Sequence, residues 1–95
     1  MADVLTDTER STALQARPQW SEVSGAIQRT YQFKDFAAAM AFVNRVAQAA
    51  ERADHHPDIL IRYNKVTLTL STHDAGGVTR KDFDLAAEAD AAATG

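Results

Sequence analysis

Three histidines are the residues of this sequence best suited to proton-transfer chemistry, and all of them lie in its second half. They are His55, His56 and His73. An imidazole has an ordinary pKa of about 6.5, so it can accept or release a proton at neutral pH. The chain between the second and third histidine is β-prone, and a hairpin there would fold His73 back toward the other two. The three imidazoles are therefore the candidate site.

The hairpin is predicted from the short connection between its two strands. Asn64 and the residue after it separate two β-prone segments, and asparagine tolerates a positive φ in such turns. A two-residue connection at this point pairs Tyr63 with Val66. Extended along both strands, the same register places His56 opposite His73, with Cβ atoms about 4.5–5.5 Å apart.

Three interpretations of the histidines are open on spacing alone. They could be surface imidazoles that make ordinary hydrogen bonds. They could bind a metal, but the spacing matches no known metal motif, and His55 and His56 point to opposite sides of an extended chain. They could transfer protons without a metal, and the absence of cysteine and of an acidic residue at motif spacing favours this third interpretation, so no metal is expected. No serine lies in a nucleophile-elbow sequence.

Capping residues and hydrophobic periodicity predict three helices and four strands around this site. The helices are expected at about 7–16 (Thr6 and Glu9 have capping-box spacing), from the cap Asp35 to about 52, and from Thr79, with Asp82 three positions on. The strands are expected at about 20–23, 27–33, 58–63 and 66–72. The order α-β-β-α-β-β-α predicts an α+β fold, with a four-stranded antiparallel sheet and the helices packed on its apolar face.

Two apolar features are assigned to the core. Trp20 is the only tryptophan, and its size favours burial over a role in stacking on a ligand. The long helix has an apolar stripe at helical spacing that is expected to pack against the sheet. The stripe consists of Phe36, Ala39, Met40, Val43, Val46, Ala47 and Ala50.

Length and composition narrow the class of protein. The chain has 95 residues, 45% of them hydrophobic, which predicts a single domain over 1–95. The formal net charge of −3 argues against nucleic-acid binding through a basic patch. The absence of cysteine is compatible with a reducing compartment, and we find no signal peptide and no membrane span. A cytoplasmic location is therefore expected.

A spaced pattern of histidine and acidic residues runs through the second half of the chain. It reads Glu51-x-x-x-His55-His56-Pro57, followed by Tyr63, His73 and Asp82. This pattern resembles the signature of the pterin-4a-carbinolamine dehydratase family. Thr72-His73 followed by Gly76-Gly77-Val78-Thr79 is similar to the family as well, and so is Phe33-Lys34-Asp35-Phe36. Trp20 stands where the family carries a tryptophan, although Gln19 replaces the glycine that often precedes it.

The resemblance implies dehydration of 4a-hydroxytetrahydropterin to quinonoid dihydropterin, a step in tetrahydrobiopterin recycling that needs no cofactor. His55, His56 and His73 match the three active-site histidines of the family. We expect His55 and His56 to transfer protons and His73 to orient the substrate. Asp82 is expected near the pocket, where it either caps its helix or orients a histidine. Trp20, Asp54 and Glu51 are weaker candidates for contact with the substrate, and Glu51 is equally well explained as a solvated side chain at a helix end.

The resemblance also bears on partners. Family members form dimers or tetramers, so a homodimer or homotetramer is expected, through a sheet edge or the long helix. An alternative function is a protein-binding role or a role as a dimerisation cofactor on the same fold, with catalysis secondary. The presence of all three histidines favours the enzyme, and nothing in the sequence identifies a particular protein partner.

Overall fold

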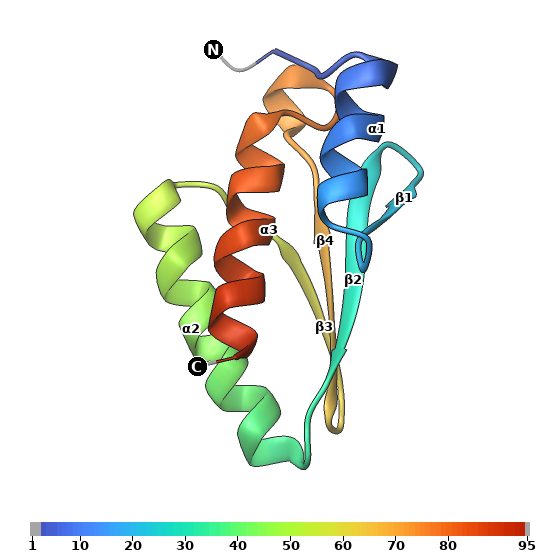
Figure 1. Cartoon of the computed structure of the whole chain (residues 1–95). Helices are drawn as coiled ribbons and strands as arrows, with labels where there is room; N and C mark the ends of the chain where they lie inside the picture. The colour runs from blue at the N-terminus through green and yellow to red at the C-terminus, as the bar shows by residue number, and fades with distance from the viewer. Residues whose placement is uncertain (1–2, 95) are drawn as a thin grey trace.

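The predicted order of elements is confirmed in the computed structural model, which describes residues 3–94 (Figure 1). Three α-helices and one four-stranded antiparallel sheet follow one another as expected from the sequence. The elements are α1 (Asp7–Ala16), β1 (Ser21–Val23), β2 (Ala26–Gln32), α2 (Phe36–Ala53), β3 (Asp58–Arg62), β4 (Lys65–Leu70), the short 3₁₀ helix η1 (His73–Ala75) and α3 (Arg80–Ala93). Within the described residues, no helix has the length and apolar character needed to cross a bilayer.

The helices begin where the capping residues predict. At α1, the Glu9 amide donates to Thr6 Oγ1 at 3.1 Å, and the Thr6 amide donates to Glu9 Oε1 at 2.8 Å. At α2, the Ala38 amide donates to Asp35 Oδ1 at 2.8 Å. Each cap satisfies backbone donors that have no partner inside the helix, and so fixes where the helix starts.

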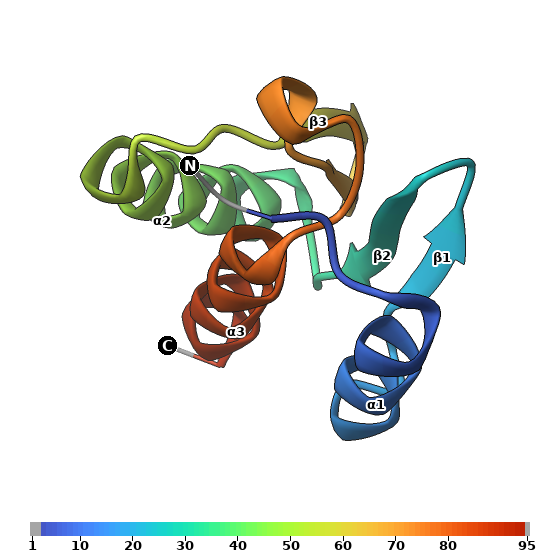
Figure 2. The ribbon, with the colours of Figure 1, turned by 90° about the horizontal axis from the view of Figure 1, so that it is seen from above.

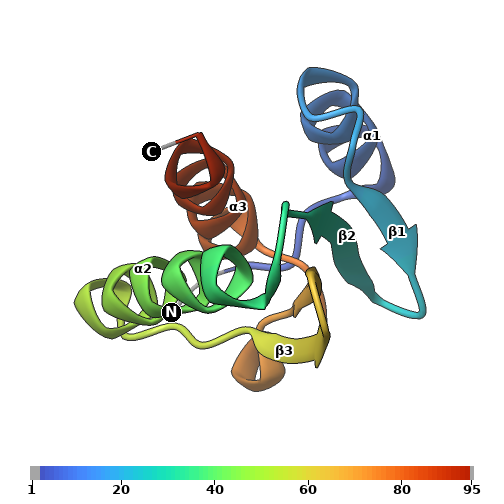
Figure 3. The ribbon, with the colours of Figure 1, turned by 90° about the horizontal axis from the view of Figure 1, so that it is seen from below.

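The sheet has the order β1-β2-β4-β3, so the hairpin of β3 and β4 packs against β2 through its second strand. All three helices lie on the same side of the curved sheet (Figures 2 and 3). The core between them is built from buried apolar side chains of both layers, with α1 adding half-buried side chains at its margin. The largest fully buried side chains among these are Ile27, Phe42, Val46, Val66, Leu68, Leu70 and Leu85.

The predicted register of the hairpin is wrong by two residues. Val66 pairs with Ile61, whereas the sequence suggested Tyr63 as its partner. Tyr63 instead lies in the turn, takes the positive φ of 53° and is 66% exposed. The cause is a contact from outside the hairpin, because the Asn64 side chain donates to the Phe33 carbonyl at 2.8 Å and the Phe33 amide donates to the Asn64 carbonyl at 2.9 Å. For the residues that stay in the paired strands, a shift of two residues leaves each side chain on its predicted face, since side chains alternate with a period of two.

The expected pairing of His56 with His73 is therefore not formed. The ladder between β3 and β4 extends only from the pair Asp58–Thr69 to the turn, so it stops short of both histidines. After Leu70 the chain leaves the sheet, and His73 begins η1. Any approach of the three imidazoles must come from the loops at this end of the sheet.

The apolar stripe predicted for α2 is only partly correct. Ala39, Val46 and Ala50 are buried, but Phe36 is 50% exposed and Ala47 is also exposed. The buried face includes two unpredicted residues, Phe42 and Ala49. The helix carries apolar side chains around more than half of its circumference, so periodicity cannot choose between neighbouring arcs, and packing against the sheet decides.

Asp90 ties the C-terminal half of α3 to the sheet and to the segment after α1. Its carboxylate accepts hydrogen bonds from Trp20 Nε1 at 3.1 Å, Arg29 Nη1 at 2.7 Å and Arg17 Nη1 at 3.0 Å. It also accepts a short hydrogen bond from the Tyr31 hydroxyl. Burial, together with the neighbouring Asp90 carboxylate, raises the pKa of the Tyr31 hydroxyl, so tyrosine stays the donor of this bond.

Candidate active site

The end of α2 places His55 at the head of α3. Asp54 caps the helix in the left-handed conformation, with φ 50° and ψ 43°, and its amide donates to the Ala50 and Glu51 carbonyls. The His55 amide then donates to the Ala50 carbonyl at 3.1 Å. This turn reverses the chain and directs the His55 side chain toward the first turn of α3. In the described part of the chain, the Asp54 carboxylate makes no hydrogen bond to an imidazole, so its defined role is to shape the turn.

His55 and Asp82 form the most buried pair of the site. His55 Nε2 lies 2.6 Å from Asp82 Oδ1, and the two side chains are only 11% and 0% exposed. The other oxygen, Asp82 Oδ2, accepts from the Thr79 amide and from the Thr72 hydroxyl, both at 2.9 Å. Asp82 therefore both caps α3 and holds a histidine, so the two roles considered for it occur together.

The contact with Asp82 orients the His55 ring, and an ionised carboxylate at this position selects one tautomer of a neutral imidazole. An ionised carboxylate can only accept hydrogen bonds, so the proton between the two groups belongs to His55 Nε2. A neutral imidazole with Nε2 protonated leaves Nδ1 as a hydrogen-bond acceptor. The buried Asp82 carboxylate thus fixes the orientation of the His55 ring, and in this tautomer Nδ1 can accept a hydrogen bond.

His56 lies in a more open setting. Its Nε2 is 2.6 Å from Glu51 Oε2, and both side chains are exposed. A solvent-exposed pair of this kind contributes at most about 1 kcal/mol to stability. Glu51 thus remains a solvated side chain at a helix end and also contacts one of the candidate histidines.

The three imidazoles line one hollow even though the sheet does not pair them. It has a volume of about 260 Å³ and is formed by the loop after α2 and the loop after β4. Its lining residues are Asp54, His55, His56, Ser71, Thr72, His73, Asp74 and Lys81. His73 enters from the first position of η1 and is exposed. The predicted proximity of the three histidines is therefore found, but two loops and η1 bring them together, and the hairpin ladder does not.

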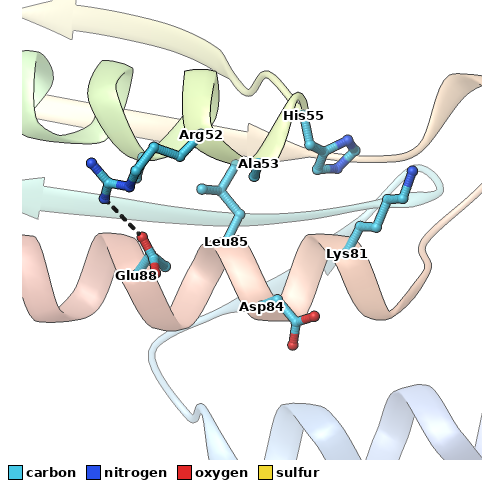
Figure 4. Close-up of a pocket in the computed structure, with 8 residues that line it drawn as sticks. Arg52, Ala53, His55, Lys81, Asp84, Leu85 and Glu88 are labelled. Atoms are coloured by element: carbon cyan, nitrogen blue, oxygen red, sulfur yellow. Dashed lines mark hydrogen bonds and ion pairs between the residues drawn. The ribbon is translucent and has the colours of Figure 1, made fainter.

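Four residues of this hollow were not predicted as site residues: Ser71, Thr72, Asp74 and Lys81. Lys81 lies in the first turn of α3 and also lines an adjoining groove of about 350 Å³ between α2 and α3. Figure 4 shows Lys81 and His55 at one end of this groove and the Arg52–Glu88 ion pair, 3.4 Å long, at the other. The capping-box spacing of Thr79 and Asp82 could have indicated Lys81, because it places Lys81 in the first turn of α3, next to Asp82.

Trp20 does not join the histidines. It is buried in the core, and its indole N–H donates to Asp90, eight residues beyond Asp82 on α3. Eight residues of helix correspond to about 12 Å along the axis. The core interpretation of Trp20 therefore agrees with the structure, in which Trp20 does not line the hollow that the histidines share.

Over residues 3–94 no group of three or more histidine, aspartate or glutamate side chains is arranged to hold a metal ion. The geometry explains this, since His55 and His56 each direct Nε2 at a different carboxylate. What the site offers is a set of imidazoles around one hollow, the most buried of them held by an anion. This arrangement is suited to general acid–base chemistry on a small molecule.

The fold and the site together define an α+β protein with a histidine-lined hollow at one end of its sheet. The family model described as pterin 4 alpha carbinolamine dehydratase matches residues 3–92. The chain belongs to this family. It is 59% identical to a protein of a Picosynechococcus species over 86 residues, which cover 90% of this chain and 94% of that protein. It is 54% identical to a protein of Nocardia farcinica, with 93% of each chain covered. Both bear the name "Putative pterin-4-alpha-carbinolamine dehydratase".

Solved structures show the same fold. A transcriptional coactivator/pterin dehydratase from Brucella melitensis matches with a TM-score of 0.93 and 41% identity, covering 96% of this chain and 99% of that one. A pterin dehydratase-like protein described as a RuBisCO assembly factor of the alpha-carboxysome matches with a TM-score of 0.65 and 24% identity, covering 78% and 86%. The second likeness concerns the fold alone.

Proposed function

We propose that this protein dehydrates 4a-hydroxytetrahydropterin to quinonoid dihydropterin by metal-free acid–base catalysis. The observation that carries the proposal is the buried His55–Asp82 pair, which opens onto a hollow shared with His56 and His73. Membership of a dehydratase family gives the class of substrate. The product is the form of the pterin that a reductase returns to the tetrahydro state, so the reaction would serve tetrahydrobiopterin recycling.

The reaction needs one proton donor and one proton acceptor. A base removes the proton on N5, and the electron pair of that N–H bond forms the C4a=N5 double bond. The C4a–O bond breaks, and an acid protonates the departing hydroxyl group to give water. One proton is taken up and one is delivered, so no electron acceptor is involved and the site regains its starting state by exchanging a proton with solvent.

The geometry suggests how the histidines divide this work. His55, with Nε2–H held by Asp82, presents Nδ1 as the base for the N5 proton. His56, paired with Glu51 in an open setting, supplies the proton to the leaving hydroxyl group and exchanges readily with solvent. His73 faces the same hollow from η1 and orients the pterin. Asp82 acts through His55 as a positioning residue.

A dehydration assay before and after exhaustive chelation tests the metal-free part of this proposal. We expect the rate to be unchanged by chelation, because loss of water from this substrate requires only proton transfer. Metal analysis of the purified protein is expected to find no stoichiometric zinc. One zinc per chain, with activity lost on chelation and restored by zinc, would contradict the proposed chemistry.

We also propose that the chain forms a symmetric homodimer or homotetramer. The edge strands β1 and β3 leave unpaired backbone groups that proteins usually cover. Ile59 and Leu60 on β3, and Phe36 on α2, are large exposed apolar side chains. Light scattering at micromolar concentration should therefore show an oligomer. Leu60→Lys should weaken the oligomer if the β3 edge forms the interface, and Phe36→Glu should weaken it if α2 does. A monomeric wild-type protein would refute this assembly.

A protein-binding role without catalysis is the alternative function. The same exposed apolar side chains of β3 and α2 would serve it, and the Brucella melitensis protein is described as both a coactivator and a dehydratase. A protein-binding role does not require the His55–Asp82 pair. Both side chains are largely buried, so they contribute little to a surface that a protein partner could contact. The pair therefore favours the enzyme.

A further inference from the structure

Thr72 lies behind the active-site histidines and touches the group that holds one of them. Its side chain is buried, and its hydroxyl donates to Asp82 Oδ2 at 2.9 Å. Asp82 uses its other oxygen to accept from His55 at 2.6 Å. Thr72 is thus one hydrogen bond removed from the His55 imidazole, and it also lines the hollow that the three histidines share.

The direction of every hydrogen bond in this buried chain is fixed. Thr79 Oγ1 accepts from the Lys81 amide at 3.2 Å, and the hydroxyls of Thr72 and Thr79 lie 2.8 Å apart. Each hydroxyl has one proton to donate. Since the Thr72 proton goes to Asp82, the proton between the two threonines belongs to Thr79. The chain of donors therefore runs from Thr79 through Thr72 to Asp82 and ends on the same anion as His55.

The backbone of Thr72 organises the second loop of the site. Its amide donates to the Gly77 carbonyl at 2.9 Å, and its carbonyl accepts from the Ala75 amide at 3.1 Å and the Gly76 amide at 3.0 Å. These bonds close the turn that carries His73, the residue immediately after Thr72. One residue therefore touches the support of His55 with its side chain and shapes the loop of His73 with its backbone.

We infer that Thr72 is a positioning residue whose hydroxyl aims the Asp82 carboxylate and thereby holds His55 in the Nε2–H tautomer, with Nδ1 open to the substrate. The expected effect of the Thr72 hydroxyl on the dehydration rate rests on the proposed function, whereas its expected effect on the His55 tautomer rests on geometry alone. Without the hydroxyl, Asp82 Oδ2 keeps only the Thr79 amide as a donor, so the carboxylate is freer to rotate away from His55. Nε2 then loses its fixed acceptor, and the imidazole populates both tautomers.

The test compares Thr72→Val, which keeps the branched shape and removes the hydroxyl, with Thr72→Ser, which keeps the hydroxyl. Long-range ¹H–¹⁵N NMR spectra report which ring nitrogen of His55 carries the proton. We expect a single Nε2–H tautomer in the wild type and the Ser variant, and a mixture in the Val variant. Dehydration by the Val variant should be slower by about 10- to 100-fold, the cost of one hydrogen bond to a charged group, with the Ser variant near wild type.

Clear outcomes would overturn the inference. A folded Val variant with the wild-type tautomer and rate would do so, and so would a Ser variant that behaves like the Val variant, since shape would then matter and the hydroxyl would not. If the Val variant does not fold, Thr72→Ala also lacks the hydroxyl, adds no bulk and is subjected to the same measurements. A wild-type protein without dehydratase activity would end the proposed function, whereas the tautomer comparison would still decide the role of Thr72.

Discussion

Replacing His55 by alanine is expected to slow dehydration by about 10²–10⁴-fold, the usual contribution of one positioned acid or base. His56→Ala should cause a loss in the same range, because the reaction requires both a donor and an acceptor. His73→Ala should weaken substrate affinity more than turnover, since His73 orients the pterin. Steady-state rates at several substrate concentrations separate the effect on turnover from the effect on affinity.

The control for these variants is Asn44→Ala, an exposed position on the helix that leads to His55. This variant should keep the wild-type rate, and circular dichroism should show the same fold for all four proteins. Near-wild-type turnover in both His55→Ala and His56→Ala would reject the assignment of proton transfer and support the binding role. Equal losses of turnover and affinity in all three histidine variants would reject the division of roles.

Asp90→Ala is expected to lower the free energy of unfolding by about 3 kcal/mol or more, the effect of removing one partner from a largely buried charged network. The Asp90 side chain is 15% exposed and holds two arginines, Arg17 and Arg29. Its loss leaves both guanidinium groups, the Trp20 indole N–H and the Tyr31 hydroxyl without their acceptor. Urea denaturation followed by circular dichroism measures the change.

Asp84→Ala is the matched control, because Asp84 is an exposed aspartate of the same helix. Its free energy of unfolding should stay within about 0.5 kcal/mol of wild type, as for most surface substitutions. Asp90 lies about 12 Å along α3 from Asp82, so the folded Asp90→Ala protein should retain its dehydration rate at low temperature. Similar stability losses in the two variants would show that the Asp90 network does not hold α3 to the sheet.

The sequence predicts most of the fold because many of its signals are local. Each helix starts with a side chain that caps its own backbone, as with Asp35 and Ala38, and needs no distant contact. The register of the hairpin is different, because Asn64 is held by Phe33, which precedes it by 31 residues. Local turn preferences cannot report such a contact, so they placed the turn one residue too late, at Asn64-Lys65 instead of Tyr63-Asn64, which changes the strand register by two.

The site was predictable to the extent that its residue types are distinctive. The three histidines were singled out from their chemistry and spacing, and Asp82 was placed near them by the resemblance to the family; all four meet at the same end of the sheet. Thr72 was missed because a threonine near the end of a strand is unremarkable until its hydroxyl is seen on Asp82. Asp90 was missed for the same reason, since a single aspartate in an alanine-rich segment gives no sign of the four donors that reach it from elsewhere in the chain.

The central claim is that the wild-type protein speeds the loss of water from 4a-hydroxytetrahydropterin. Stopped-flow mixing of the purified protein with freshly generated carbinolamine, followed by ultraviolet absorbance, measures this most directly. We predict a rate that rises in proportion to protein concentration and well above that of buffer, and a His55→Ala, His56→Ala double variant that adds almost nothing. A wild-type protein that leaves the rate at the buffer value, while folded and able to bind the pterin, would contradict the account.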